Sequence, residues 1–430
     1  MISDYLRHKF LNGLKLITAP ILNTEAVTVL ILLPVGSRYE SKNLNGASHF
    51  IEHMMFKGTR KRPSNLLIAK ELDAIGAEYN AFTAKDLTGY WVKLDKDFLE
   101  KGVEILADIL FNSIFDQNDF EKEKGVILEE IKMYKDNPLL FIDDLFEQTI
   151  YGDHPLGWLI SGEEENIKNF NRQTILDFKN RYYQVNQMLI VIAGNIKNKT
   201  TVEIIKKSFG RQSSLRKRKS VFKKFLKTKQ KGPNFKKLSK DVQQIQLALG
   251  FPAYSYFHPN LDALNLLSII LGGNMSSRLF TEVRVKRGLA YFIKTDLNVY
   301  QDTGNFVIRA GVDGERVVEA IKVILEELRK IRDQGVDDEE LNRAKNFYEG
   351  KLSLNLEDSA EVAAWYAKQE MLIGKILTPE AKIAKIKKVQ LKDIQAVAKE
   401  IIQPKALNLA LIGPQTINQS LLLSILRKGL

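Results

Sequence analysis

Two of the five histidines in this 430-residue chain lie four positions apart, within the segment ASHFIEHMMFKGT at residues 47–59. On a helix, His49 and His53 would lie on one face, about 40° apart. Glu52 would lie about 60° to the other side of His49. Two imidazoles at this spacing can bind one divalent metal ion, and the adjacent carboxylate can reach a water molecule bound to that ion. The segment therefore carries the residue types of a catalytic metal site.

The order of these three residues, H-x-x-E-H, matches the inverted zinc-peptidase motif. The alternative is an apolar helix whose histidines are hydrogen-bonded in the core, and a third metal ligand would argue against it. Candidates for this ligand occur in EKEKGVILEEIKMY at residues 121–134. Glu123 and Glu130 would share a helix face, about 20° apart, whereas Glu129 would be turned about 100° from Glu130. These glutamates could equally be surface residues that pair with neighbouring lysines, and helix geometry by itself leaves that choice open.

The composition is that of an ordinary globular protein, with 44% hydrophobic and 27% charged residues. The length predicts at least two domains. The chain contains no cysteine, which excludes a disulfide scaffold and thiolate metal ligands. No apolar run approaches the roughly 18 residues of a membrane span, and residues 1–20 lack the pattern of a signal peptide. We therefore expect a cytoplasmic protein without a membrane span.

The net charge of +12 is concentrated in one segment. Residues 211–240 contain 13 lysines and arginines and no acidic residue, so the rest of the chain has a net charge near −1 (12 minus 13). The segment also contains Gly232-Pro233 and clustered serines, as is typical of a linker. We expect a solvated, partly flexible connector. A surface that attracts acidic peptides, lipid or nucleic acid is the alternative.

The linker divides the chain into halves that have the same order of expected elements. The first half has a strand at 26–36, the helix with the two histidines, paired strands at 77–94, and long helices at about 97–114 and 117–136. The second half repeats this order with a strand at 242–251, a helix at 260–273, a hairpin at 289–310, and helices at about 315–333 and 337–353. Its first helix contains DALNLLSII, without histidine or glutamate.

This order predicts an internal duplication of two similar α+β domains, each a mainly antiparallel β-sheet packed with helices. We expect a zinc-binding catalytic domain at 1–210, the basic linker at 211–240, and a homologous metal-free domain at 241–430.

The chain resembles the pitrilysin-type zinc metallopeptidases (family M16, inverzincins). It is most similar to the short-chain members, which include the mitochondrial processing peptidase β subunit and related bacterial peptidases. The resemblance extends along nearly the whole chain and implies the processing-peptidase/LuxS-like metallohydrolase fold. It is carried by PVGSRYE (34–40), HFIEHMMFKGT (49–59), GAEYNAFTAKDLTGYW (76–91), EKEKGVILEEI (121–131), HPLG (154–157) and SSRLFTEVRVKRGLAYF (276–292).

The resemblance implies that His49 and His53 bind one Zn²⁺ per chain and that Glu52 is the general base. The family pattern E-x-E-x-x-V-I-x-x-E places the third ligand at Glu130 and a second acidic residue at Glu123. A count from His53 with the family's spacing would select the glutamate directly before Glu130. The reason is that the spacing from His53 to Glu130 is one residue longer here than in the family. The helix-face argument favours Glu130.

Further site residues follow from the same resemblance. Asn80, Ala81 and Phe82 match the family's edge strand, whose backbone pairs with an extended substrate as an added strand. Arg284 and Tyr291 match a pair that contacts the substrate carbonyl near the scissile bond. The resemblance therefore implies that the metal-free domain at 241–430 completes the substrate site. Without the resemblance, Arg284 and Tyr291 would be interpreted as an exposed helix arginine and a tyrosine at the start of a strand.

The expected activity is zinc-dependent hydrolysis of peptide bonds in short or unfolded polypeptides inside a clamshell chamber. Glu52 would take a proton from the zinc-bound water and return it to the leaving amine. The metal, Tyr291 and Arg284 would stabilise the oxyanion.

The short-chain members resemble a half-shell that closes against a second chain. A homodimer is favoured because the zinc-binding set is complete, and a heterodimer with a related subunit stays open. Two alternative functions are a non-catalytic or partner-dependent subunit of a heterodimeric processing peptidase, and a module that binds nucleic acid through the basic linker. The intact motif argues against the first, and the second would require binding that depends steeply on salt.

Overall fold

The structure is a computed structural model that describes residues 5–213, 222–225, 230–416 and 418–430. The chain divides into two compact units, which interleave along the sequence. Unit 1 comprises Met1–Lys132, Trp158–Lys223 and Ser353–Ile376, and unit 2 comprises Met133–Gly157, Lys224–Leu352 and Leu377–Leu430. The expected ranges 1–210 and 241–430 were continuous, whereas each unit takes one segment from the other half of the chain.

Unit 1 is built on a six-stranded sheet in the order β1-β2-β6-β3-β5-β4. Its strands are Leu6–Lys9 (β1), Lys15–Pro20 (β2), Ala26–Leu33 (β3), Glu78–Thr83 (β4), Thr88–Asp95 (β5) and Leu189–Gly194 (β6). β2 and β6 run parallel, and the other neighbours run antiparallel. The inner strands β3 and β6, AVTVLILL and LIVIAG, are apolar along nearly their whole length because helices cover both faces of the sheet.

Unit 2 repeats this topology in a five-stranded sheet of order β7-β11-β8-β10-β9. Its strands are Asn234–Ser239 (β7), Gln244–Ala253 (β8), Ala290–Val299 (β9), Gly304–Asp313 (β10) and Asn408–Gly413 (β11). β7 and β11 run parallel, and the other neighbours run antiparallel. The same order and directions occur in β2-β6-β3-β5-β4 of unit 1, so the expected duplication and the mainly antiparallel α+β fold are confirmed.

Helices of the N-terminal half pack on one face of the unit 1 sheet. They are α1 (Ala47–Met55), α2 (Asn65–Asp73), α3 (Leu99–Asn112), α4 (Gln117–Asp136), α6 (Glu164–Asn169), α7 (Arg172–Tyr182) and α8 (Asn198–Phe209). Alternate residues of β3, such as Val29 and Ile31, share a core with Phe50 and Met54 of α1 and Ile109 of α3. This core fixes α1 against the sheet.

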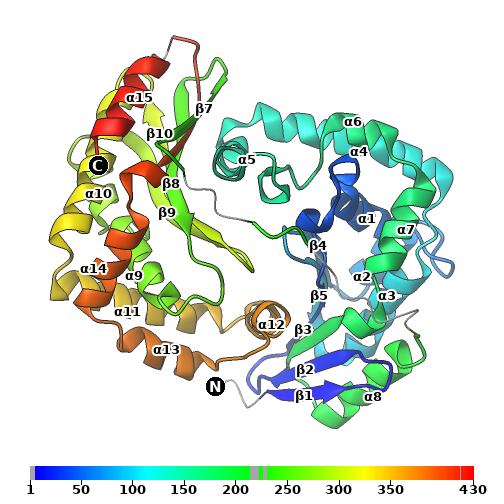
Figure 1. Ribbon diagram of the computed structural model, residues 1–430. Coiled ribbons are helices and arrows are strands. Elements are labelled where there is room, and N and C mark those ends of the chain that lie inside the picture. The colour runs from blue at the N-terminus through cyan, green and yellow to red at the C-terminus, as the bar shows by residue number, and fades with distance from the viewer. Residues whose placement is uncertain (1–4, 214–221, 226–229, 417) are drawn as a thin grey trace. The chain divides into compact units, whose positions relative to one another are not determined.

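The opposite face of the unit 1 sheet is covered by α12 (Ser359–Lys368), which comes from the C-terminal half (Figure 1). The buried hydroxyls of Thr28 on β3 and Ser359 are 2.8 Å apart, and Lys93 Nζ lies 2.9 Å from the carboxylate of Asp358. In unit 2 the equivalent exchange is made by α5 (Pro138–Tyr151), which packs on β8 and β11. Each sheet therefore needs a helix from the other half of the chain.

The end of the segment expected to be a linker is structured. β7 lies within 211–240 and forms the edge of the unit 2 sheet. Lysines are common on edge strands because they discourage pairing with other chains. The two lysines of NFKKLS made this short strand look like part of the basic linker in the sequence. The expected linker is thus corrected at this end. Its residues 214–221 and 226–229 lie outside the described part of the chain.

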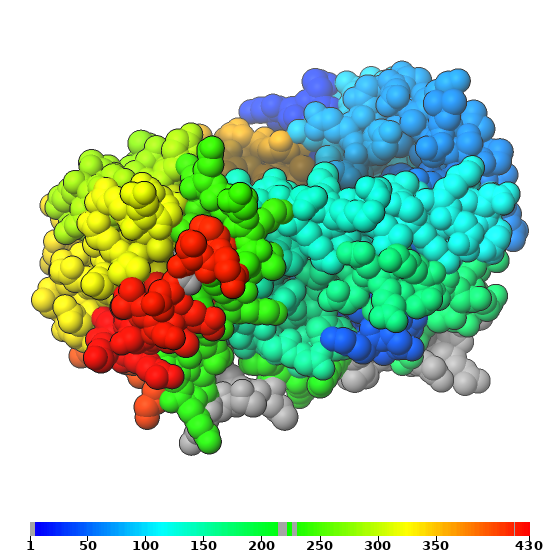
Figure 2. Space-filling view, turned by 90° about the horizontal axis from the view of Figure 1, so that it is seen from above, coloured from blue at the N-terminus to red at the C-terminus, as the bar shows by residue number. Residues whose placement is uncertain are grey.

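The remaining helices belong to unit 2. They are α9 (Leu261–Gly272), α10 (Val317–Gln334), α11 (Asp338–Asn355), α13 (Pro379–Lys387), α14 (Leu391–Ile401) and α15 (Gln419–Lys428). Figure 2 shows α15, in red, beside α10, in yellow; Leu422 and Leu426 of α15 share a core with Leu325 of α10. Within the described residues, every helix is too short or too polar to span a bilayer.

Candidate metal centre

The helix expected over the opening motif is α1, and its N-terminus is held by a buried glutamate. Gly46 precedes the helix with φ of 102°, a left-handed conformation that suits glycine. One oxygen of Glu40 accepts a hydrogen bond from the Gly46 N–H at 2.8 Å, and the other accepts one from the Ser48 N–H at 2.7 Å. Asn45 Nδ2 also donates to Glu40 at 3.1 Å. Glu40 thus satisfies N–H groups that a helix start leaves without intrahelical partners.

Helix α4 lies beside α1 because apolar residues along one side of α4 are buried. Phe120, Ile127 and Ile131 occupy this side, and the rings of Phe120 and Phe50 are 4.6 Å apart. The spacing of these residues, close to the helical repeat, also places Glu123 on the buried side. Packing of the two helices therefore decides which glutamates face the histidines.

The structure brings His49, His53 and Glu130 together. Each offers one possible ligand atom, and these atoms lie within 4.8 Å of one another. Glu130 Oε2 lies 3.7 Å from His49 Nε2 and 3.4 Å from His53 Nε2. By contrast, the side chain of Glu129 is 74% exposed and pairs with Lys132 at 2.7 Å. The structure thus places Glu130, and not Glu129, beside the two histidines.

The donor set fits a zinc ion. Among the described residues, buried Glu130 Oε2 has no hydrogen-bond partner, although two ring nitrogens converge on it. A buried acceptor without a donor is costly, and a cation between these atoms would satisfy it. Two imidazole nitrogens and one carboxylate oxygen form the ligand set of several catalytic zinc sites, which leave a further position for water.

Glu123 lies behind this cluster and contacts it through His53. Glu123 is 3% exposed, and its Oε1 lies 2.8 Å from His53 Nδ1. A proton on Nδ1 would leave Nε2 of His53 with its lone pair towards Glu130. The structure thus places Glu123 beside Nδ1 of His53 and Glu130 beside Nε2 of both histidines.

The two histidines have different electrostatic environments. Burial and the nearby charge of His53 lower the pKa of His49 to about 4. Burial also disfavours the charged form of His53, but its hydrogen bond with Glu123 and the nearby carboxylate of Glu130 outweigh it and raise the pKa of His53 to about 9. Near neutral pH these shifts therefore favour the neutral form of His49 and the charged form of His53.

Glu52 projects from the same helix and has a partner that the sequence did not suggest. The hydroxyl of Thr83, at the end of β4, donates a hydrogen bond to its carboxylate. Burial raises the pKa of Glu52, and this hydrogen bond lowers it in part. The only indication of this contact in the sequence was that Thr83 directly follows Asn80-Ala81-Phe82, the predicted substrate-binding strand.

β4 is the edge strand of the unit 1 sheet and packs against α1. Ala81 is buried, whereas Asn80 is exposed. Phe82 lies over Gly89, where a side chain would collide with its ring. The strand therefore packs next to the helix that carries the two histidines.

Arg284 and Tyr291 lie in unit 2, so their approach to the histidines stays a prediction. The guanidinium of Arg284 lies over the rings of Phe280, at 4.9 Å, and Tyr291, at 5.6 Å. Tyr291 is 71% exposed. The two predicted substrate contacts are thus neighbours within their own unit.

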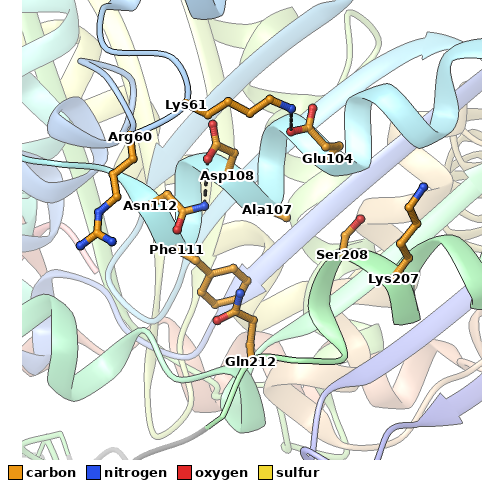
Figure 3. A pocket seen from close by; sticks show the side chains of 10 residues that line it. All are labelled: Arg60, Lys61, Glu104, Ala107, Asp108, Phe111, Asn112, Lys207, Ser208 and Gln212. Carbon is orange, nitrogen blue, oxygen red and sulfur yellow. Dashed lines mark hydrogen bonds and ion pairs between the residues drawn. The ribbon is translucent and has the colours of Figure 1, made fainter.

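A pocket of about 410 Å³ in unit 1 is a different feature (Figure 3). Its walls come from α3, α8 and the residues Arg60 and Lys61, and none of the three possible ligands lines it. Lys61 pairs with Glu104 at 2.7 Å, and Asn112 donates to Asp108 at 2.9 Å. Because its acidic groups already have partners, we place the candidate site at the histidine cluster.

Two family models match consecutive parts of the chain. Residues 16–163 match the family described as Insulinase (Peptidase family M16), and residues 169–348 match the Peptidase M16 inactive domain. The chain belongs to peptidase family M16. The part matched to the inactive domain contains none of His49, His53 and Glu130.

Several M16 relatives are similar over nearly their whole length. The uncharacterized zinc protease YmxG of Bacillus subtilis is 34% identical over 412 residues, covering 95% of this chain and 98% of that protein. The uncharacterized zinc protease SCO5738 of Streptomyces coelicolor is 32% identical, covering 94% and 88%. The crystal structure of a protease from Helicobacter pylori superposes with a TM-score of 0.91 at 26% identity, covering 96% and 100%.

Proposed function

We propose that this M16 protein is a zinc-dependent metalloendopeptidase that hydrolyses short or unfolded polypeptides. The observation that carries the proposal is the convergence of ligand atoms from His49, His53 and Glu130 within 4.8 Å. Glu52 lies on the same helix as the two histidines. The names of the relatives support zinc as the metal.

In this proposal, His49 and His53 present their Nε2 atoms and Glu130 its carboxylate to one zinc ion. When bound, zinc supplies a Lewis acid and lowers the pKa of a bound water. Glu52 accepts a proton from the attacking water at its carboxylate and returns it to the leaving amine. The raised pKa of Glu52, caused first by burial, suits a group that must both take and release a proton.

We propose that the substrate binds as an extended strand along β4. Among the described residues β4 pairs on one side only, with β5. The free edge at Asn80, Ala81 and Phe82 can pair with any extended backbone, which favours unfolded chains over a particular sequence. Arg284 and Tyr291 are proposed to contact the carbonyl near the scissile bond.

The proposal is tested by zinc analysis combined with cleavage of a quenched fluorescent peptide, with and without a chelator. We expect one zinc per chain, activity that the chelator abolishes, and recovery on adding zinc. Glu52→Gln should keep zinc, because Glu52 is not a ligand, while losing hydrolysis. A Glu52→Gln variant that cleaves at the wild-type rate would refute the mechanism.

We further propose that the active species is a closed chamber formed by two copies of the chain. Light scattering at micromolar concentration, together with the cleavage assay, tests this assembly. A monomer with full activity would refute the chamber and leave the zinc chemistry intact.

A non-catalytic or partner-dependent subunit is the second candidate, supported by the match of residues 169–348 to an inactive domain. It predicts a zinc-loaded protein that cleaves no peptide until a related subunit is added.

A further inference from the structure

Lys57 contacts the carboxylate that supports His53. Its Nζ lies 2.5 Å from Glu123 Oε2, while Glu123 Oε1 lies 2.8 Å from His53 Nδ1. The two oxygens of one buried carboxylate are thus divided between a lysine and a possible metal ligand. This lysine belongs to the segment FKGT that follows the histidine motif, and the proposed chemistry gives it no role.

The fold brings Lys57 and His53 to the same side of Glu123. Lys57 follows the end of α1, and its N–H donates to the carbonyl of Met54 at 3.2 Å, which continues the helical turn. His53 and Lys57 are four residues apart, so their side chains are neighbours on one face. Glu123 therefore joins α4 to His53 in the last turn of α1 and to Lys57 just beyond the end of that helix.

Glu123 is buried beside Lys57. It is only 3% exposed, so water cannot readily replace a lost partner. A buried carboxylate that loses its counter-ion keeps a desolvated charge, and its side chain would turn to recover partners. Such a turn would move Oε1 away from His53 Nδ1.

His49 lacks a comparable support. Among the described residues its Nδ1 is buried without a hydrogen-bond partner, whereas Nδ1 of His53 has Glu123. The His53 ring is therefore supported by Glu123, and Glu123 in turn contacts Lys57.

We propose that Lys57 is a positioning residue of the metal site, which holds Glu123 so that His53 presents Nε2 to the metal. This inference rests on the proposed zinc site. Support of a ligating histidine by a carboxylate typically changes metal affinity about 10- to 100-fold, and we expect loss of Lys57 to produce an effect in this range.

The test compares zinc affinities of the full chain, measured by competition with a chromogenic chelator. Lys57→Met should weaken zinc binding at least about tenfold, and Lys57→Arg, which keeps the charge, should restore most of it. Lys132→Met is the matched control because Lys132 belongs to an exposed pair on α4, and it should bind zinc as the wild type does. In the zinc-bound protein, the NMR shifts of the His53 Nδ1–H group should change in Lys57→Met, because its hydrogen bond to Glu123 would be displaced.

A double-mutant cycle separates this role from general stability. In a Glu123→Gln background, Lys57→Met should cause little further loss of zinc affinity, since Lys57 acts through Glu123. Equal losses in both backgrounds, or wild-type affinity in Lys57→Met, would overturn the inference. If Lys57→Met does not fold, the comparison is made between Lys57→Gln and Lys57→Arg, and equal zinc affinity in these two would overturn it. A wild-type protein that binds no zinc would instead refute the proposed function.

Discussion

The hydroxyl of Thr83 donates a hydrogen bond to the carboxylate of Glu52, which joins the edge strand of unit 1 to the metal helix. Thr83 is the last residue of β4, and Glu52 lies between the two histidines on α1. The group proposed to move the proton is therefore held by the strand proposed to bind the substrate. Displacement of β4 would also displace Glu52.

Replacing Thr83 by valine should lower kcat/KM by about 10- to 100-fold, since hydrogen bonds to charged groups contribute roughly 1.5–3 kcal/mol. The hydrogen bond lowers the pKa of Glu52 against the effect of burial. Its loss should therefore raise that pKa and move the acidic limb of the pH–rate profile to higher pH. Thr83→Ser, which keeps the hydroxyl, is the control. An unchanged profile in the valine variant would contradict this assignment.

The adjacent glutamates of α4 should respond differently to neutralisation. Glu130→Gln should reduce zinc occupancy and activity sharply, because a catalytic zinc site has three protein ligands. Glu129→Gln should have little effect, since Glu129 is exposed and pairs with Lys132. Glu123→Gln should be intermediate and weaken activity more than metal binding. Zinc loss from the Glu129 variant alone, measured by metal analysis, would reverse the assignment.

Zinc binding should release close to one proton per chain near neutral pH. Zinc binds the neutral imidazole; the pKa of His53 is raised to about 9, and that of His49 is lowered to about 4. Below about pH 9, binding must remove the proton from His53, so the apparent affinity should fall about tenfold for each pH unit as pH decreases. If both histidines had the ordinary pKa of about 6.5, the apparent zinc affinity would hardly change with pH above about pH 7. Competition titrations across this range distinguish the two outcomes.

The buried cap of α1 should make stability depend on pH. Burial raises the pKa of Glu40 from 4.5 to about 7, against the hydrogen bonds from Ser48 and Gly46. The folded state then binds this proton more tightly than the unfolded state, so the contribution of Glu40 to stability is full below about pH 4.5 and is lost as pH rises through about 7. Glu40→Gln should lose this dependence. This substitution should also destabilise α1, because the NH₂ group of the new glutamine side chain would face the N–H of Gly46 or Ser48. Denaturant unfolding at several pH values is the measurement, and parallel profiles for the two proteins would contradict it.

Local geometry was enough to predict several features of the site. Within one helix, a rotation of 100° per residue determines that His49 and His53 share a face and that Glu130 and Glu129 do not. The order of apolar periodicities along the chain likewise predicted the duplication, because each half had to build the same sheet with the same helices. These predictions needed no knowledge of where distant segments meet.

Only the tertiary structure decided which distant residues meet. Thr28 lies against Ser359, 331 positions later, and Glu52 is held by Thr83 from a separate strand. The basic run gave no sign that Asn234–Ser239 would pair with β11 as an edge strand. Such contacts depend on strand order and on where the chain returns to a sheet. These are set by the burial of all the apolar faces at once, and not by the pattern of any one segment.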